Sequence, residues 1–209
     1  MGCGGRWEGG SRKRGHIKKI NFSFPFIIKP NAEGSSIAIN TNSIVHNKKE
    51  LISQLDWIEE NYSGNIMVEQ YVHGKDISIA YVEGIGSLGA VEICHSSELY
   101  DYLLKSIDDE NIIIKPFNNQ IVDKLKEIVE FISKKLDIKG YAKFDFRVSD
   151  NRIFLIEINA QVSFHPNGEF MESAYAKGYS FDDIILHILK NAFNIEKRHF
   201  SVGINNNLI

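Results

Sequence analysis

The sequence predicts an α+β fold of antiparallel strands with packed helices. Short runs rich in Phe, Ile and Val are separated by tight turns, which is typical of hairpin strands. One segment, residues 121–136, instead repeats apolar side chains every three or four positions, which indicates an amphipathic helix. The chain has 209 residues, 43% of them hydrophobic, which is enough for one sizeable core or two small ones.

Charge and cysteine content exclude several classes of protein. Lys and Arg total 24 against 27 Asp and Glu, a net charge of -3, so no basic surface is expected for nucleic acid or an anionic membrane. Cys3 and Cys94 have neither disulfide-framework nor zinc-site spacing. No apolar run approaches the roughly 18 residues of a membrane span. We expect a cytoplasmic protein with neither nucleic-acid nor membrane partners.

The first half of the chain predicts a small sheet with one helix. Residues 1–23 are rich in Gly, Lys and Arg and are predicted to form an irregular leader. Strands are expected at residues 24–30 and, after a loop at 31–36, at 37–40. Asn47 followed by Glu50 resembles a capping box and predicts a helix to about Asn61. Three further strands, expected to form an antiparallel meander, lie at residues 66–72, 76–83 and 87–94.

The second half is expected to cover a hairpin with helices. Residues 95–111 have no clean period and are predicted to form a long loop, which in a compact domain is usually functional. Two strands, at residues 141–148 and 153–159, flank a turn. The closing helices are expected at residues 170–177 and 180–193, the second capped by Ser180, and the chain after Glu196 is expected to be a frayed tail.

The predicted hairpin brings polar side chains together. If its turn has three residues centred on Asn151, Asp145 lies opposite Glu157, and the period of two places Glu157 and Asn159 on one face. Burying two carboxylates and an amide oxygen among apolar strands is costly unless their negative charge is compensated. A bound Mg²⁺ or Mn²⁺ ion would supply that compensating charge. The alternative is an ordinary polar sheet face, with both carboxylates paired to Lys143 and Arg147.

A lysine and a small-residue loop suggest a phosphate site elsewhere. Lys29 ends an apolar strand, and Gly34, Ser35 and Ser36 follow it closely, so their backbone amides could face phosphates. Lys29 could also simply extend its ammonium to solvent. A cation, amide donors and a carboxylate pair are together what a nucleotide site needs.

Six segments in order resemble the ATP-grasp region of D-alanine–D-alanine ligases, from about residue 24 to residue 193. These are IIKP-NAEGSS, IMVEQYVHGKDISIAYV, LYDYLLK, GYAKFDFRV, FLIEINA and AKGYSFDDIILHIL. The resemblance implies an ATP-grasp fold and ligation of a carboxylate to an amine, with ATP first forming an acyl phosphate. It implies small-molecule partners, namely amino acids, and a place in peptidoglycan biosynthesis.

The same resemblance implies roles for individual residues. Lys29 would contact the nucleotide phosphates under a flap of Gly34, Ser35 and Ser36. Glu69 would accept from adenine, with Gln70, Tyr71 and Val72 as hinge, and Asp76 would hold the ribose although the family usually has Glu there. Lys105 would bring positive charge to the transferred phosphoryl group. The metal ligands, for two Mg²⁺ ions, would be Asp145, Glu157 and Asn159.

The chain departs from the family at the substrate positions. Lys143 replaces an arginine two residues before the metal aspartate, which keeps the catalytic charge but loses the two-pronged guanidinium. Ser106 replaces a substrate-binding tyrosine after Lys105. Residues 160–169 replace the segment that lines the acceptor amino acid, so His165 and Glu169 are either new acceptor contacts or ordinary loop residues. Substrate identity is therefore left open.

The resemblance also implies a division of the chain. We expect a leader at residues 1–23, a partial central ATP-grasp subdomain at 24–94, a C-terminal ATP-grasp subdomain at 95–196 and a tail at 197–209. Relative to the ligases, the fold is expected to be truncated at its N-terminal side. The chain would then be a ligase completed by a partner chain, or a nucleotide-binding fragment or pseudoenzyme. A scaffold in an interaction protein, using uncovered sheet edges, is a third reading.

Overall fold

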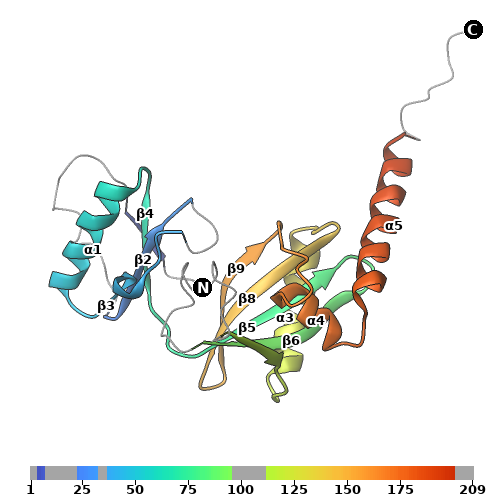
Figure 1. The fold of residues 1–209 in the computed structure, drawn as a ribbon, viewed down its shortest axis with the longest axis horizontal. Coiled ribbons are helices and arrows are strands. Elements are labelled where there is room, and N and C mark those ends of the chain that lie inside the picture. Colours follow the sequence, from blue (N-terminus) through green and yellow to red (C-terminus); the bar gives the residue numbers. More distant parts are fainter. Residues whose placement is uncertain (1–3, 8–22, 33–36, 96–111, 201–209) are drawn as a thin grey trace, which may run out of the picture. The chain divides into compact units, whose positions relative to one another are not determined.

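The described chain divides into two compact units. The computed structural model describes residues 4–7, 23–32, 37–95 and 112–200 (Figure 1). Of the described residues, one unit contains those up to His73 together with His95, Ile112 and Ile113, and the other contains Gly74–Cys94 and residues 114–200. The sequence places a subdomain boundary after Cys94, whereas the units divide after His73. The strands just after Gly74 pair with strands late in the chain, which explains the difference.

The first unit is a four-stranded sheet with the order β1–β4–β2–β3. Its strand β4 pairs antiparallel with β1 and β2, and β3 pairs antiparallel with β2. The strands are Gly4–Trp7 (β1), Phe26–Pro30 (β2), Ile44–Val45 (β3) and Ile66–Gln70 (β4). The expected strands near residues 24–30 and 66–72 are therefore confirmed.

Two predictions for this unit are wrong. The leader is not irregular throughout, because Gly4–Trp7 pairs with the edge of β4, whose backbone groups accept another strand whatever its side chains. No strand forms at residues 37–40. Ala38, in a turn there, has a left-handed φ of 62°, and the 3₁₀ helix Thr41–Ser43 (η2) precedes the actual pairing strand β3.

Helix α1, Lys48–Asn61, covers one face of this sheet. Asn47 caps it as predicted, since its side chain accepts from the backbone N–H groups of Lys49 and Glu50. The apolar face of the helix packs on the alternating buried residues of β2 and β4. The buried cluster is Phe26, Ile28, Val45, Leu51, Leu55, Ile58, Ile66 and Val68. Alternation leaves Lys29 and Glu69 on the opposite face of the sheet.

The second unit is built on a five-stranded sheet with the order β7–β6–β5–β8–β9. Its strands are Lys75–Val82 (β5), Gly86–Cys94 (β6), Ile113–Pro116 (β7), Tyr141–Ser149 (β8) and Arg152–Asn159 (β9). The β5–β6 and β8–β9 hairpins are confirmed. The predicted three-stranded meander is wrong, because β4 pairs with β1 and β2 while β5 pairs with β6 and β8.

Gly74 explains why the chain leaves one sheet and enters the other at this point. Its φ is +156°, and a Cβ there would lie 2.4 Å from the carbonyl oxygen of Val148. Only glycine fits so close to the β8 backbone, so the chain can begin β5 directly beside β8.

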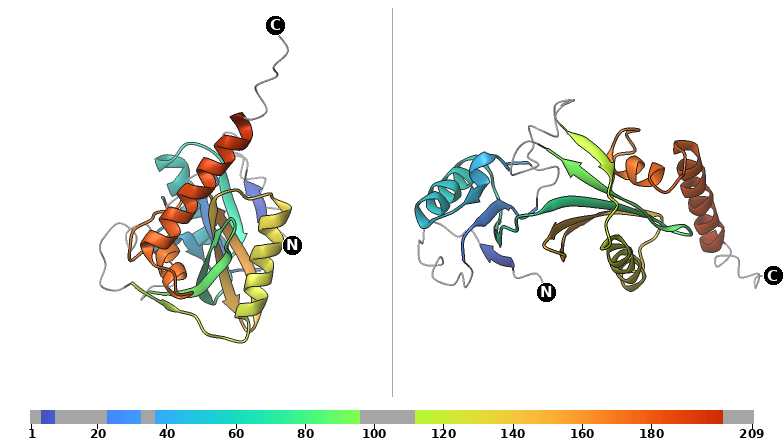
Figure 2. Two further views of the ribbon diagram at one scale, coloured as in Figure 1. Left: turned by 90° about the vertical axis from the view of Figure 1, so that its right-hand side faces the viewer. Right: turned by 90° about the horizontal axis from the view of Figure 1, so that it is seen from below.

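Helices cover parts of both faces of the second sheet, as Figure 2 shows. Helix α3, Val122–Lys135, packs on Phe144, Phe146 and the residues around them. Helices α4, Glu169–Tyr175, and α5, Phe181–Phe200, pack on the other face through Phe170 and Ile184. Alternation along β8 thus places Phe144 and Phe146 under α3 and turns Lys143, Asp145 and Arg147 to the opposite face.

The closing helices match the prediction except at the end. Ser180 caps α5 reciprocally: its hydroxyl accepts from the Asp183 N–H while the Asp183 carboxylate accepts from the Ser180 N–H. The helix continues to Phe200, beyond the tail predicted to begin at residue 197, because no glycine or proline interrupts residues 181–200. Within the described residues, no helix has the length and apolar character needed to cross a membrane.

Candidate active site

The β8–β9 hairpin places Asp145 opposite Glu157 by a route that differs from the predicted one. The turn has two residues, Asp150 and Asn151, both with positive φ (47° and 63°), as tight hairpin turns require. This turn alone would pair Asp145 with Ile156. A β-bulge after Leu155 takes Ile156 out of register, so Asp145 pairs with Glu157 and Lys143 with Asn159.

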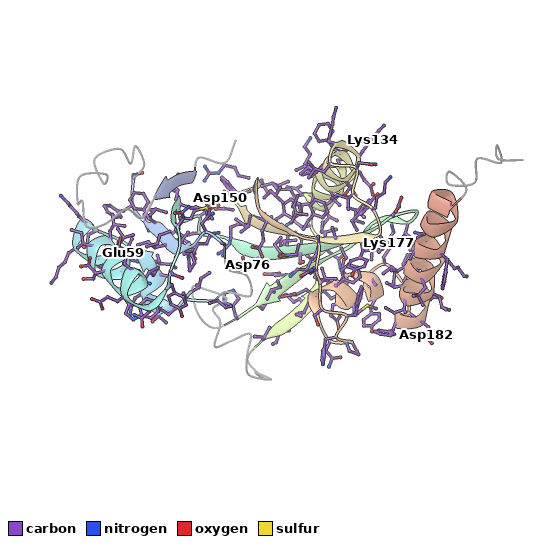
Figure 3. All side chains as sticks on the ribbon, turned by 90° about the horizontal axis from the view of Figure 1, so that it is seen from above. Glu59, Asp76, Lys134, Asp150, Lys177 and Asp182 are labelled. Atoms are coloured by element: carbon purple, nitrogen blue, oxygen red, sulfur yellow. The ribbon has the colours of Figure 1, made fainter. Side chains whose placement is uncertain are left out.

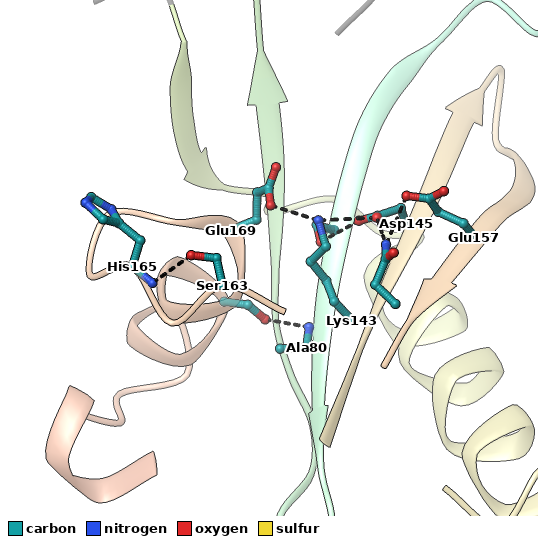
Figure 4. A network of polar contacts seen from close by, with 10 residues as sticks. Ala80, Lys143, Asp145, Glu157, Ser163, His165 and Glu169 are labelled. Carbon is teal, nitrogen blue, oxygen red and sulfur yellow. Dashed lines mark hydrogen bonds and ion pairs between the residues drawn. The ribbon is translucent and has the colours of Figure 1, made fainter. Parts of the chain in front are cut away.

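The three predicted metal ligands meet around one amide. The Asn159 Nδ2 group donates to Asp145 Oδ2 and to Glu157 Oε1, each at 2.9 Å (Figure 4). Two carboxylate oxygens therefore converge on a single amide NH₂ group, whose hydrogens carry partial positive charge. The three side chains converge as predicted, but the amide presents its nitrogen to the carboxylates rather than the predicted oxygen.

Ser78, on the neighbouring strand β5, completes the surroundings of Asp145. Its hydroxyl is fully buried and donates to Asp145 Oδ1 at 2.8 Å. Burial raises the pKa of the Asp145 carboxyl above its ordinary value, while Lys143 and the Ser78 hydroxyl act in the opposite direction. A divalent cation beside Asp145 would offset this cost of burying a carboxylate.

Lys143 lies between two carboxylates on the same face of the sheet. Its Nζ is 3.3 Å from Asp145 Oδ2 and 2.8 Å from Glu169 Oε2 (Figure 4). Glu169 is the first residue of α4. Burial opposes the lysine charge, but the two carboxylates outweigh it and raise the pKa of the Lys143 ammonium. Lys143 therefore stays protonated, and Glu169 is an ion-pair partner rather than an ordinary loop residue.

Asp76 and Arg147 form the next pair along the sheet. They are direct neighbours on β5 and β8, with Arg147 Nη2 2.9 Å from Asp76 Oδ1. Figure 3 marks Asp76 at the start of β5 and Asp150 in the hairpin turn, at the same end of the sheet. The alternative reading of a polar sheet face, with Lys143 and Arg147 paired to Asp145 and Glu157, is confirmed for Lys143 and Asp145, whereas Arg147 forms its ion pair with Asp76.

In the first unit, two of the expected nucleotide contacts, Lys29 and Glu69, lie on the sheet face opposite α1. Lys29 Nζ lies 2.7 Å from Glu69 Oε2, and the two side chains are 17% and 33% exposed. Gln70 ends β4, and Tyr71 and Val72 continue without regular structure. Tyr71 is buried against Ile44, and its N–H donates to the Pro25 carbonyl. These contacts hold the predicted hinge backbone in place.

Four expected site residues lie outside the described part of the chain. They are the flap residues Gly34, Ser35 and Ser36 and the loop lysine Lys105. Their assignments remain predictions.

The donor set in the second unit fits a hard cation. Among the described residues, no three His, Cys, Asp or Glu side chains form a metal-binding group, so the candidate set is two carboxylates and one amide. Rotating the Asn159 amide by half a turn would exchange Nδ2 for Oδ1 and present three oxygens. Oxygen ligands of this kind suit Mg²⁺ or Mn²⁺.

Ser78 is the site residue that the sequence analysis missed. Asp76 and Ser78 are polar residues at a spacing of two in the strand KDISIAYV, where they alternate with Ile77 and Ile79. That period places both on one face, so the spacing was a usable signal. The Lys143–Glu169 contact had no local signal, because the two residues are 26 positions apart.

Comparison with known proteins identifies the family of this chain. The family model described as D-ala D-ala ligase C-terminus matches residues 6–190. The D-alanine–D-alanine ligase of Petrotoga mobilis is 30% identical over 175 residues, covering 81% of this chain and 57% of the relative. That of Buchnera aphidicola is 34% identical over 179 residues, covering 83% and 56%. The chain thus spans a little over half the length of these relatives.

Solved structures show the same fold. A D-alanine–D-alanine ligase from Bacillus anthracis in complex with ATP superposes with a TM-score of 0.74 at 20% identity, covering 95% of this chain and 62% of that one. The VanG D-Ala:D-Ser ligase from Enterococcus faecalis gives 0.71 at 20% identity, covering 91% and 56%. The expected α+β, ATP-grasp fold is confirmed, and the chain belongs to the family defined by the C-terminal region of D-alanine–D-alanine ligases.

Proposed function

We propose that this chain is the ATP- and Mg²⁺-binding part of a carboxylate–amine ligase of the D-alanine–D-alanine ligase type. The observation that carries the proposal is the convergence of Asp145, Glu157 and Asn159 within a chain that matches the family over residues 6–190. In the reaction, ATP would phosphorylate a carboxylate, and an amine would then displace phosphate from the acyl phosphate. The substrates would be amino acids, for peptidoglycan biosynthesis.

The nucleotide would be held mainly by the predicted residues of the first unit. Glu69 would accept from the adenine amino group, and Gln70, Tyr71 and Val72 would provide the hinge backbone. Lys29 would contact the phosphates under the flap of Gly34, Ser35 and Ser36. Because Lys29 and Glu69 form an ion pair with each other, their proposed contacts with ATP would compete with this pair. Asp76, from the second unit, would hold the ribose hydroxyls with its carboxylate fixed by Arg147.

The metal ligands would be Asp145, Glu157 and Asn159, and they would hold two Mg²⁺ ions, or Mn²⁺ in their place. The bound cations would neutralise negative charge on the transferred phosphoryl group. Lys143 would add positive charge at the acyl phosphate, and Lys105 would bring a second positive charge. Positioning and charge neutralisation are the main demands of phosphoryl transfer.

Nucleotide titration of the purified chain tests this proposal. A non-hydrolysable ATP analogue should bind in calorimetry with an affinity that rises when Mg²⁺ is added. Asp145→Asn and Glu157→Gln should abolish the Mg²⁺ dependence, whereas Asp182→Asn, exposed in the first turn of α5, should not. Mg²⁺-independent binding, or unchanged binding in both site variants, would overturn the metal assignment.

A second candidate function is a nucleotide-binding module without ligase activity, either a fragment or a pseudoenzyme that needs a partner chain. The observation in its favour is that Lys143, in place of the family arginine, is held by two carboxylates. Amino-acid-stimulated ADP release by the chain alone would contradict it. Binding of the analogue, together with no ADP release from ATP in the presence of any amino acid, would favour it. Adding candidate partner chains would then test whether a second chain completes the active site.

The expected cytoplasmic location stays a prediction.

A further inference from the structure

Lys143 and Glu169 form an ion pair whose role the proposed function leaves open. The Lys143 ammonium is nearer to Glu169 (2.8 Å) than to Asp145 (3.3 Å). The three side chains are only 12%, 18% and 20% exposed for Lys143, Glu169 and Asp145 respectively. Charges this enclosed are poorly screened by water, so the distribution of the lysine charge between its two partners matters.

Glu169 is held in place by the packing of α4. It is the first residue of the helix, and the next residue, Phe170, is buried in the core. The Ser173 hydroxyl donates to the Gly89 carbonyl and accepts from the Ala80 N–H, which ties α4 to β5 and β6. The backbone that carries Glu169 is therefore fixed relative to the sheet that carries Lys143 and Asp145.

Asp145 cannot serve two cations equally well. In the proposed function it binds a divalent cation, yet its Oδ2 also accepts the Lys143 ammonium. Lys143 and the metal carry like charges and would compete for this oxygen. Glu169 offers the lysine a second counter-ion on the side away from Glu157, as Figure 4 shows.

We propose that Glu169 is a positioning residue that holds Lys143 off Asp145 when a divalent cation binds there. This inference rests on the proposed function, because it concerns the same metal site. In the structure Lys143 bridges both carboxylates. When a cation binds, Lys143 would remain with Glu169, which would leave Asp145 available as a metal ligand. Glu169 thereby raises metal affinity without touching the metal.

Mn²⁺ binding in the presence of the non-hydrolysable ATP analogue tests the inference, with electron paramagnetic resonance reporting free Mn²⁺. Glu169→Gln should weaken Mn²⁺ binding about tenfold, the effect of roughly one uncompensated charge contact. Glu169→Asp keeps the charge but shortens the reach, so it should also weaken binding, by about threefold or more. Glu172→Gln and Glu172→Asp, on the same helix and without an ion pair among the described residues, should match the wild type.

Lys143→Met in the Glu169→Gln background shows whether the lysine is the cause. Removing the competing ammonium should return Mn²⁺ affinity to within about twofold of the wild type. If the double variant stays as weak as Glu169→Gln, or if Glu169→Asp binds like the wild type, the positioning role is wrong. Wild-type chain that binds the analogue but no Mn²⁺ would overturn the proposed metal site itself. Matching circular dichroism spectra would exclude misfolding.

Discussion

Replacing Asn159 by aspartate should make the stability of the second unit depend on a divalent cation. The wild-type amide donates at 2.9 Å to Asp145 and to Glu157. Asn159→Asp removes both bonds and adds a third carboxylate. Bonds to charged groups are worth about 1.5–3 kcal/mol each, and the exposed Glu157 counts for least, so we expect a loss of about 3 kcal/mol. The melting temperature should fall by about 10 °C.

Thermal unfolding with and without Mg²⁺ and the ATP analogue measures this effect. Asn159→Ala, which loses the bonds without adding charge, should be destabilised by less than Asn159→Asp. Cation and analogue together should raise the melting temperature of Asn159→Asp by more than that of Asn159→Ala, because three carboxylates gain most from a cation. Equal melting of Asn159→Asp and wild type without cation would show that the carboxylates are not in contact. An absence of cation rescue would refute a metal site there.

Three further predictions concern the fold. Phe144→Ala, at a fully buried position, should cost about 3–5 kcal/mol in chemical denaturation, whereas a loss under 1 kcal/mol would mean that α3 does not pack there. Asn47→Ala should cost about 1 kcal/mol because α1 loses its cap; Asn47→Asp, which can still accept those bonds, should not. The His46 N–H donates to the Glu50 carboxylate and lowers its pKa. The ionised carboxylate therefore stabilises the fold fully at pH values above the ordinary pKa of glutamate. This stabilisation is lost as the pH falls through the lowered pKa of the folded protein. Glu50→Gln should flatten that acid limb of a stability–pH curve, and an unchanged curve would contradict the assignment.

The sequence was informative wherever a periodic pattern decided the local structure. The helix predicted over residues 121–136 and the hairpin strands 141–148 and 153–159 correspond to α3, β8 and β9. Strand pairing was less predictable, because β4 and β5 are separated by a short segment that can equally be a hairpin turn or a crossing between sheets. Only the close approach of Gly74 to the Val148 carbonyl decides between them, and that contact lies 74 residues away along the chain.

The candidate site could be predicted in chemistry but not in all of its contacts. Asp145 and Asn159 stood out because polar residues in Phe- and Ile-rich strands need partners. Lys143 was expected near Asp145, and it is, but its nearer partner Glu169 comes from a helix whose position no local pattern specifies. Contacts of this kind depend on how α4 packs on the sheet, which the sequence of either segment does not contain.

The position of Glu157 shows how a correct strand pairing can follow from an incorrectly predicted turn. The prediction used a three-residue turn. The actual turn has two residues, Asp150 and Asn151, and a β-bulge further along β9 leaves one residue, Ile156, without a partner on β8. Both routes shift the partner of Asp145 by one position, to Glu157. The bulge shifts the strand register only at the end of the hairpin where Asp145, Glu157 and Asn159 lie. Phe146 and Val148 stay paired in the register that the turn sets. Because a one-residue slip turns every side chain of a strand to the other face, the bulge lets one strand satisfy both the tight turn and the polar cluster.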